Sequence, residues 1–211
     1  MRPEYFFGVD LGQRRDRTAF AILERSQTVA AIPDPITWER ARSTHHQVRH
    51  LERFPIGTAY TVVIQRIERL GRMLANMGAC NLIVDATGVG LPVIDALRIP
   101  GAPWRLMPVT ITYGVSEAWS DGLWRVPKRD LIAGLQLAFE NNHFTIAKDL
   151  KDTPALVEEL TSMRANHRVS GATQYGSPDP AHDDLAMALA LSWWAVETRR
   201  PNPLGVNKPV L

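Results

Sequence analysis

Apolar runs with polar borders dominate the first part of the chain and predict the strands of a sheet. The runs at 5–10 and 18–24 predict two strands, and the short polar loop between them predicts an antiparallel hairpin. Polar and apolar residues alternate over 46–54, which is typical of a half-exposed strand. We therefore expect three strands before the first helix.

Helical and extended patterns alternate in the next stretch. Apolar residues recur at helical spacing between 62 and 74, with Thr58 placed to cap that helix and Gly78 placed to end it. A fourth strand is predicted at 81–85 and a short helix at 91–97. The pattern therefore indicates a strand–helix–strand step.

The second half continues this alternation. We predict a strand at 104–112, helices at 127–142 and 154–165, a hairpin at 167–175, and an unusually apolar final helix at 185–196.

Strands that come first in hairpins and then alternate with helices imply an α/β fold. The sheet is expected to be mixed, with helices on both faces. We expect five strands in the order 3-2-1-4-5. The sequence shows no repeat and no domain boundary, which predicts one domain over 1–197 and a proline-rich, loosely ordered tail at 198–211.

Composition limits the classes of protein to consider. The chain has 211 residues, 45% hydrophobic and 22% charged, which is ordinary for one soluble domain. Its longest nearly apolar run, 185–196, is shorter than the ~20 residues of a membrane-spanning helix. No signal peptide precedes Tyr5, so we expect a cytoplasmic protein. The single cysteine, Cys80, cannot form an internal disulfide and is placed like a small buried hydrophobe.

Acidic residues stand at the ends of three predicted elements. Asp10 ends the first strand, Asp85 ends the fourth, and Asp183 and Asp184 open the final helix. A carboxylate at the end of a buried strand is costly unless a positive charge compensates it. The usual way to hold three such groups together is a divalent metal ion, so the pattern predicts a metal-dependent nuclease. Each acid also has an ordinary structural explanation, because aspartate is common in turns and in the first turn of a helix.

Basic residues lie near the predicted acidic site. A net charge of +2 does not by itself indicate nucleic-acid binding, but basic groups beside an acidic pocket would suit a phosphate backbone. A solvated surface explains each cluster about equally well. The candidates for contact with DNA are Arg14, Arg15, Arg17, Lys128 and Arg129.

Three polar residues are accessory candidates. His182 could orient a water molecule or bind phosphate, although a histidine beside a helix start is more often a cap or a surface group. Asp16 could approach the metals, although turn chemistry commonly explains an aspartate in a hairpin loop. Lys128 could contact the scissile phosphate, because a cation at a helix start is electrostatically out of place and needs another reason.

Three segments together resemble the nuclease domain of phage terminase large subunits. They are GVDLG at 8–12, LIVDATGVG at 82–90 and HDDLAMALA at 182–190. The stretches at 126–132 and 156–160 also lie where that family has similar sequence. The first motif alone is weak, but the three in this order are fairly specific, and the resemblance spans about residues 5–196.

The resemblance implies a ribonuclease H-like fold and two-metal hydrolysis of DNA by Mg²⁺ or Mn²⁺ during genome packaging. It implies Asp10, Asp85 and one of Asp183 and Asp184 as the catalytic metal ligands. Successive helical residues point about 100° apart, so both acids of the last pair cannot face one ion equally. We favour Asp184, because it adjoins the alanine-rich helix face that must pack on the sheet, and take Asp183 as the second choice.

The sequence departs from that family in one respect. Terminase large subunits normally also carry a packaging ATPase, whereas this chain has no Gly-x-x-x-x-Gly-Lys-Ser/Thr phosphate loop. We therefore expect a separately encoded nuclease module, or an excised or remnant domain. The resemblance also implies a phage or prophage protein of a bacterial host cell. Its expected partners are double-stranded DNA and a separate packaging ATPase, or a portal or small-terminase component.

Other hypotheses remain open on the sequence. A Holliday-junction resolvase-like nuclease shares the fold and the acid placement, but it would need a dimer and a basic surface shaped to a junction. An actin-like or sugar-kinase ATPase would need two copies of the folding unit. A nuclease-fold binding module that has lost its activity is less consistent, because every acid is present.

Overall fold

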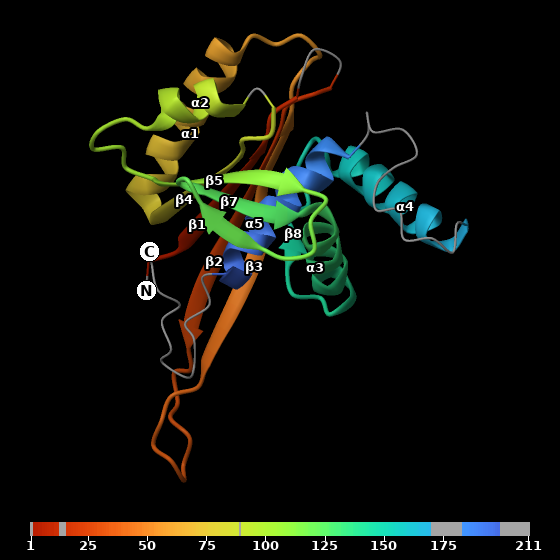
Figure 1. Ribbon diagram of the computed structural model, residues 1–211. Coiled ribbons are helices and arrows are strands. Elements are labelled where there is room, and N and C mark those ends of the chain that lie inside the picture. The colour runs from red at the N-terminus through yellow and green to blue at the C-terminus, as the bar shows by residue number, and fades with distance from the viewer. Residues whose placement is uncertain (1, 13–15, 89, 170–182, 199–211) are drawn as a thin grey trace.

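The computed structural model describes residues 2–12, 16–88, 90–169 and 183–198. Figure 1 labels their helices and strands. In chain order they are β1 (Glu4–Asp10), β2 (Ala19–Val29), β3 (Arg42–Arg53), α1 (Tyr60–Met77), β4 (Ala79–Asp85), α2 (Gly90–Leu97), β5 (Arg105–Thr112), β6 (Ala118–Ser120), β7 (Leu123–Pro127), α3 (Lys128–Glu140), β8 (Thr145–Ile146), α4 (Thr153–Val169) and α5 (Asp184–Thr198).

Within the described ranges the strands form one eight-stranded sheet in the order β6-β7-β5-β4-β1-β2-β3-β8. The five central strands have the predicted order 3-2-1-4-5, so the mixed α/β sheet is confirmed. The predicted count of five strands is wrong, because β6, β7 and β8 extend the two edges. β6 and β8 are only 3 and 2 residues long, which is too short to produce a period-two pattern, and the five residues of β7 do not alternate strictly between apolar and polar.

The two central strands β1 and β4 are adjacent and end on the same side of the sheet. β1 pairs antiparallel with β2, where Asp10 is opposite Ala19, and parallel with β4, where Val9 is opposite Val84. Parallel strands end at the same edge of a sheet. Asp10 and Asp85, the last residues of β1 and β4, therefore lie at that edge together.

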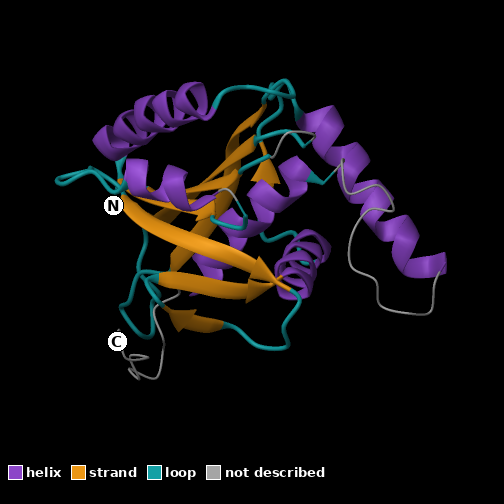
Figure 2. Cartoon of the chain, turned by 45° about the horizontal axis from the view of Figure 1, so that its top comes forward, coloured by secondary structure: helices purple, strands orange, loops and turns teal. Residues whose placement is uncertain are grey.

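Helices cover both faces of the sheet, as Figure 2 shows. Successive strand residues point to opposite faces, so Phe6 packs in the core beneath α3, α4 and α5, while Phe7 packs in the core beneath α1 and α2. Cys80 is buried in the second core, as predicted. None of the helices in the described ranges is long and apolar enough to cross a membrane.

The final helix lies directly on the middle of the sheet. Every residue of α5 from Asp184 to Val196 is buried, which explains its nearly continuous apolar sequence. Ser192 fixes the helix on the strands, since its hydroxyl accepts from the Gly8 amide at 2.9 Å and donates to the Ala21 carbonyl at 3.0 Å. Gly8 permits this approach, because a Cβ there would lie 2.0 Å from the Ala188 carbonyl oxygen.

Replacement of Gly8 by alanine is therefore expected to destabilise the protein strongly. The added methyl group must push α5 off β1, and overpacking of this kind costs up to about 3 kcal/mol, or about 6–12 °C in Tm for a chain of this size. Gly114→Ala is the control, because its added Cβ would meet only the Thr112 hydroxyl at 3.4 Å. Thermal unfolding of both variants measures the difference, and equal Tm values would show that α5 is not in close contact with β1.

Two local predictions are wrong and two lie outside the described residues. Thr58 does not cap α1, because its hydroxyl donates to the Pro55 carbonyl and Ala59 occupies the N-cap position without a side-chain hydrogen bond. The hairpin predicted at 167–175 cannot begin there, because α4 continues to Val169. The rest of that hairpin and the predicted tail after residue 198 lie outside the described residues, and the single-domain assignment stays a prediction.

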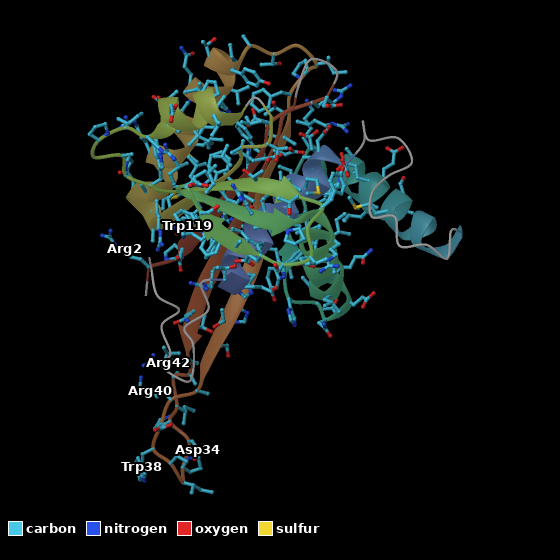
Figure 3. The ribbon with its side chains drawn as sticks, viewed as in Figure 1. Arg2, Asp34, Trp38, Arg40, Arg42 and Trp119 are labelled. Carbon is cyan, nitrogen blue, oxygen red and sulfur yellow. The ribbon has the colours of Figure 1, made fainter. Side chains whose placement is uncertain are left out.

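The β2–β3 hairpin extends well beyond the rest of the sheet (Figure 1). Its tip carries Trp38, which points away from the body of the protein (Figure 3) and is 79% exposed. Asp34 organises the tip by accepting hydrogen bonds from the Ile36 and Thr37 amides at 2.8 Å. The tip lies far from Asp10. β2 begins opposite Asp10 and runs away from it to the tip, where β3 starts.

Candidate metal centre

One pocket of about 220 Å³ opens where β1, β4 and α5 meet. The strand ends supply Asp10 and Asp85, and the start of α5 supplies Asp183 and Asp184. The structure therefore brings together the four aspartates that the sequence singled out. The remaining residues that line the pocket are Leu11, Gly12, Asp16, Thr87, Ile111, Tyr113, Lys128 and Met187.

Asp10 lies among the other carboxylates. Desolvation raises the pKa of Asp10 well above its ordinary value, and the nearby negative charges of Asp85, Asp184 and Asp183 raise it further. Lys128 acts in the opposite direction, because its positive charge favours the ionised form. The site is therefore strongly electronegative and stores repulsion that a bound cation would relieve.

Thr87 holds the carboxylate of Asp85. The Thr87 amide and hydroxyl donate to Oδ1 of Asp85 at 2.8 and 2.5 Å, and the Thr87 hydroxyl in turn accepts from the Ile111 amide of β5 at 2.9 Å. Burial raises the pKa of Asp85, and the Thr87 bonds partly offset that rise. The bond to the amide two residues on is the turn chemistry expected of an aspartate at a strand end, and it leaves Oδ2 for other partners.

The two aspartates at the start of α5 have different surroundings. Oδ2 of Asp183 accepts from Nζ of Lys128 at 2.7 Å, across the pocket wall. Oδ2 of Asp184 is buried without a hydrogen-bond partner among the residues that the structure describes. Desolvation raises the pKa of Asp184 to about 7, with further contributions from the negative charges of Asp183 and Asp16. An unpartnered buried carboxylate oxygen is costly, which favours Asp184 as a group that awaits a ligand.

The accessory candidates are only partly gathered at the pocket. Asp16 and Lys128 line it, and the charge of Arg17 is close enough to lower the pKa of Asp184. Arg129 instead donates to the Val115 carbonyl and pairs with Asp130 on the surface. The remaining candidates, Arg14, Arg15 and His182, lie outside the described residues.

Two residues that hold this site, Thr87 and Glu159, lie in segments that resemble the terminase family, but the sequence assigned neither of them a role. Glu159 of α4 is 3% exposed, and its Oε2 accepts from the Ala186 amide of α5 at 2.9 Å. Desolvation raises the pKa of Glu159 to about 7. The residue two positions after Asp85 could have been recognised as its turn partner, whereas nothing in the sequence connects Glu159 to α5.

The residues present fit a hard divalent cation. The pocket offers carboxylate oxygens, which Mg²⁺ and Mn²⁺ prefer, and it contains the unpartnered Oδ2 of Asp184. In the described part of the chain, no three His, Cys, Asp or Glu side chains already stand in a metal-binding arrangement. Since Asp183 is held by Lys128 and Asp85 by Thr87, the carboxylates would have to adjust when a metal ion binds.

Comparison with known proteins identifies the fold. No model of a known protein family matches the chain. The terminase large subunits of Thermus phage G20c and of Thermus virus P23-45 are each 22% identical to it over 194 residues, which cover 91% of this chain. The crystal structure of the large terminase nuclease from thermophilic phage G20c aligns with a TM-score of 0.52 and 20% identity, over 91% of this chain and 82% of that one. The chain has the fold of a large terminase nuclease.

The resemblance to phage terminase nuclease domains and the ribonuclease H-like fold class are thereby confirmed. The chain spans only about a third of the curated terminase relatives, since the match covers 32% of each. The activity, substrates and partners of a whole terminase are therefore only proposed for this chain.

Proposed function

We propose that the protein is a metal-dependent DNA endonuclease of the terminase large-subunit type, which cuts double-stranded DNA during packaging of a viral or prophage genome. The observation that carries this proposal is the convergence of Asp10, Asp85, Asp183 and Asp184 on one open pocket. Carboxylates that repel one another at a cost to the fold suggest a site selected for binding a cation.

Asp10, Asp85 and Asp184 would hold two Mg²⁺ or Mn²⁺ ions, with Asp183 as a further or alternative ligand. When bound, such ions supply a hydroxide-like nucleophile and stabilise the charge that develops on the phosphate and on the leaving oxygen. The chain must present these acids ionised. Because the pKa of Asp184 is raised to about 7 and that of Asp10 is raised well above its ordinary value, protons compete with the metal as the pH falls.

Lys128 is the cationic side of the same pocket. Its Nζ is held at 2.7 Å from Oδ2 of Asp183, and its side chain remains 20% exposed. In this position the ammonium group limits the repulsion among the acids and can approach a phosphate oxygen. Contacts of this kind with the phosphate backbone carry no sequence information, so we propose cleavage that is largely independent of base sequence.

The proposed function also implies partners. A nuclease of this type would act beside a packaging ATPase, and this chain has no phosphate loop of its own. A packaging ATPase, or a portal or small-terminase component, would bring the DNA to this site.

Nicking and linearisation of supercoiled plasmid test the proposal. With Mg²⁺ or Mn²⁺ we expect cleavage that EDTA abolishes and that Asp85→Asn lowers by at least about 100-fold. Asp95→Asn is the matched control, because Asp95 is an exposed acid of α2 whose side chain is 71% accessible. Absence of cleavage with either metal, together with no rise in Tm on adding metal, would refute the proposed activity.

A further inference from the structure

The first turn of α5 is capped by a side chain from another helix and not by its own N-cap residue. Asp183 occupies the N-cap position, since its carbonyl accepts from the Met187 amide at 2.8 Å. An N-cap aspartate ordinarily turns its side chain back to the second or third helical amide. Here Oδ2 of Asp183 is bonded to Lys128 instead, and the third helical amide, that of Ala186, donates to Glu159 at 2.9 Å.

We propose that Glu159 is a positioning residue for the acidic site, because it caps α5 in place of Asp183 and so leaves the Asp183 carboxylate in the pocket. This inference rests on the proposed function of that pocket. The Ala186 amide can donate to one carboxylate at a time, and the Glu159 carboxylate of α4 takes that position. The Asp183 side chain is therefore not needed to cap α5, and its Oδ2 can stay on Lys128 at the pocket.

Other elements hold Glu159 in place. Its Oε1 is 3.3 Å from a guanidinium nitrogen of Arg53, the last residue of β3, and the Arg53 amide donates to Asp152 at 3.1 Å, just before α4 begins. Arg53 thus connects the end of β3 with α4, while Glu159 connects α4 with α5. The positive charge of Arg53 also offsets a third carboxylate placed beside Asp183 and Asp184.

Glu159 is an acid at a position where burial destabilises the ionised carboxylate. The side chain is 3% exposed, and desolvation disfavours its ionised form. An apolar residue would avoid that cost if the position served only to pack α4 on α5. The bond to Ala186, 27 residues further along the chain, therefore explains an acid at this position.

Three variants separate positioning from general stability. Glu159→Ala removes the acceptor for the Ala186 amide, whereas Glu159→Gln keeps a carbonyl oxygen that can accept the same bond. Leu156→Ala is the control for lost stability, because Leu156 lies on the same helix, is fully buried and belongs to the apolar core.

The first measurement is the crystal structure of each variant without metal. In Glu159→Ala we expect the Asp183 side chain to turn from Lys128 to the Ala186 amide, and in Glu159→Gln we expect the Lys128 contact to persist. An Asp183 carboxylate that stays on Lys128 in Glu159→Ala would overturn the proposal.

The second measurement is calorimetric titration with Mn²⁺ well below the Tm of every variant. Glu159→Ala should weaken binding about 10-fold or more, while Glu159→Gln stays within about threefold of wild type. Leu156→Ala should lower the Tm without changing the affinity, and an equal loss of affinity there would also overturn the proposal. If the wild type binds no Mn²⁺, the proposed function fails, whereas the orientation of Asp183 still decides whether Glu159 replaces it as the cap.

Discussion

Asp10→Asn is expected to lower plasmid cleavage on the order of 10³-fold and, in the absence of metal, to raise the Tm. Asp10 is the carboxylate that three others surround, so it contributes most to the repulsion. An amide of the same shape removes the negative charge that would hold two cations, and losses of this size are typical of groups that act directly on the reacting centre. Cleavage of supercoiled plasmid with Mn²⁺ measures the first effect.

The gain in stability follows from the direction of the pKa shift. Because the pKa of Asp10 is raised by folding, its contribution to stability is fully present below the unfolded pKa and is lost as the pH rises through the folded pKa. At pH 8 in EDTA we therefore expect Asp10→Asn to melt about 2–4 °C higher than wild type for each kcal/mol of repulsion removed. As the pH falls toward the unfolded pKa of an aspartate, the difference should shrink, because Asp10 becomes protonated and neutral in both the folded and the unfolded state.

The matched control for both effects is Asp95→Asn, since this exposed acid lies on α2, away from the pocket-lining residues. It should leave the cleavage unchanged, and it should change the free energy of unfolding by no more than about 0.5 kcal/mol. An Asp10→Asn protein that unfolds, or melts well below wild type, would mean that Asp10 supports the fold. Unchanged cleavage would remove Asp10 from the site.

Sequence patterns were sufficient to predict the acids and the central strands for a geometric reason. Asp10 and Asp85 each end a strongly apolar strand, and adjacent parallel strands place their carboxyl ends together. The apolar run after Asp184 had to be a buried helix, which fixed the third approach to the pocket. In each case, the apolar residues that reveal the strand or helix in the sequence also bury it, and so they fix where the adjoining acid lies.

The contacts that refine the site could not be predicted in this way. Glu159 contacts Ala186 only because α4 packs beside the start of α5, and the sequence of α4 gives no indication of that neighbour. The short strands β6 and β8 arise from pairing with β7 and β3 rather than from any pattern of their own. Thr58 does not cap α1, because Ala59 occupies the N-cap position and the Thr58 hydroxyl donates to the Pro55 carbonyl.

Asp184→Asn is expected to weaken Mn²⁺ binding by about 100-fold, and Asp183→Asn by clearly less. Oδ2 of Asp184 has no partner in the described residues, so a cation can use it without breaking an existing bond. Asp183 must first give up its 2.7 Å contact with Lys128, which offsets part of what it gains from a cation. Calorimetric titration of both variants measures the difference.

The pH dependence of the same titration distinguishes the two acids further. Since the pKa of Asp184 is raised to about 7, a proton must leave it before Mn²⁺ can bind, and wild-type affinity should rise steeply between pH 6 and pH 8. That dependence should become shallower in Asp184→Asn, which has no proton to release there, and should persist in Asp183→Asn. The reverse order of the two variants, in affinity and in pH dependence, would assign the ligand role to Asp183 and leave Asp184 as the residue that opens the helix.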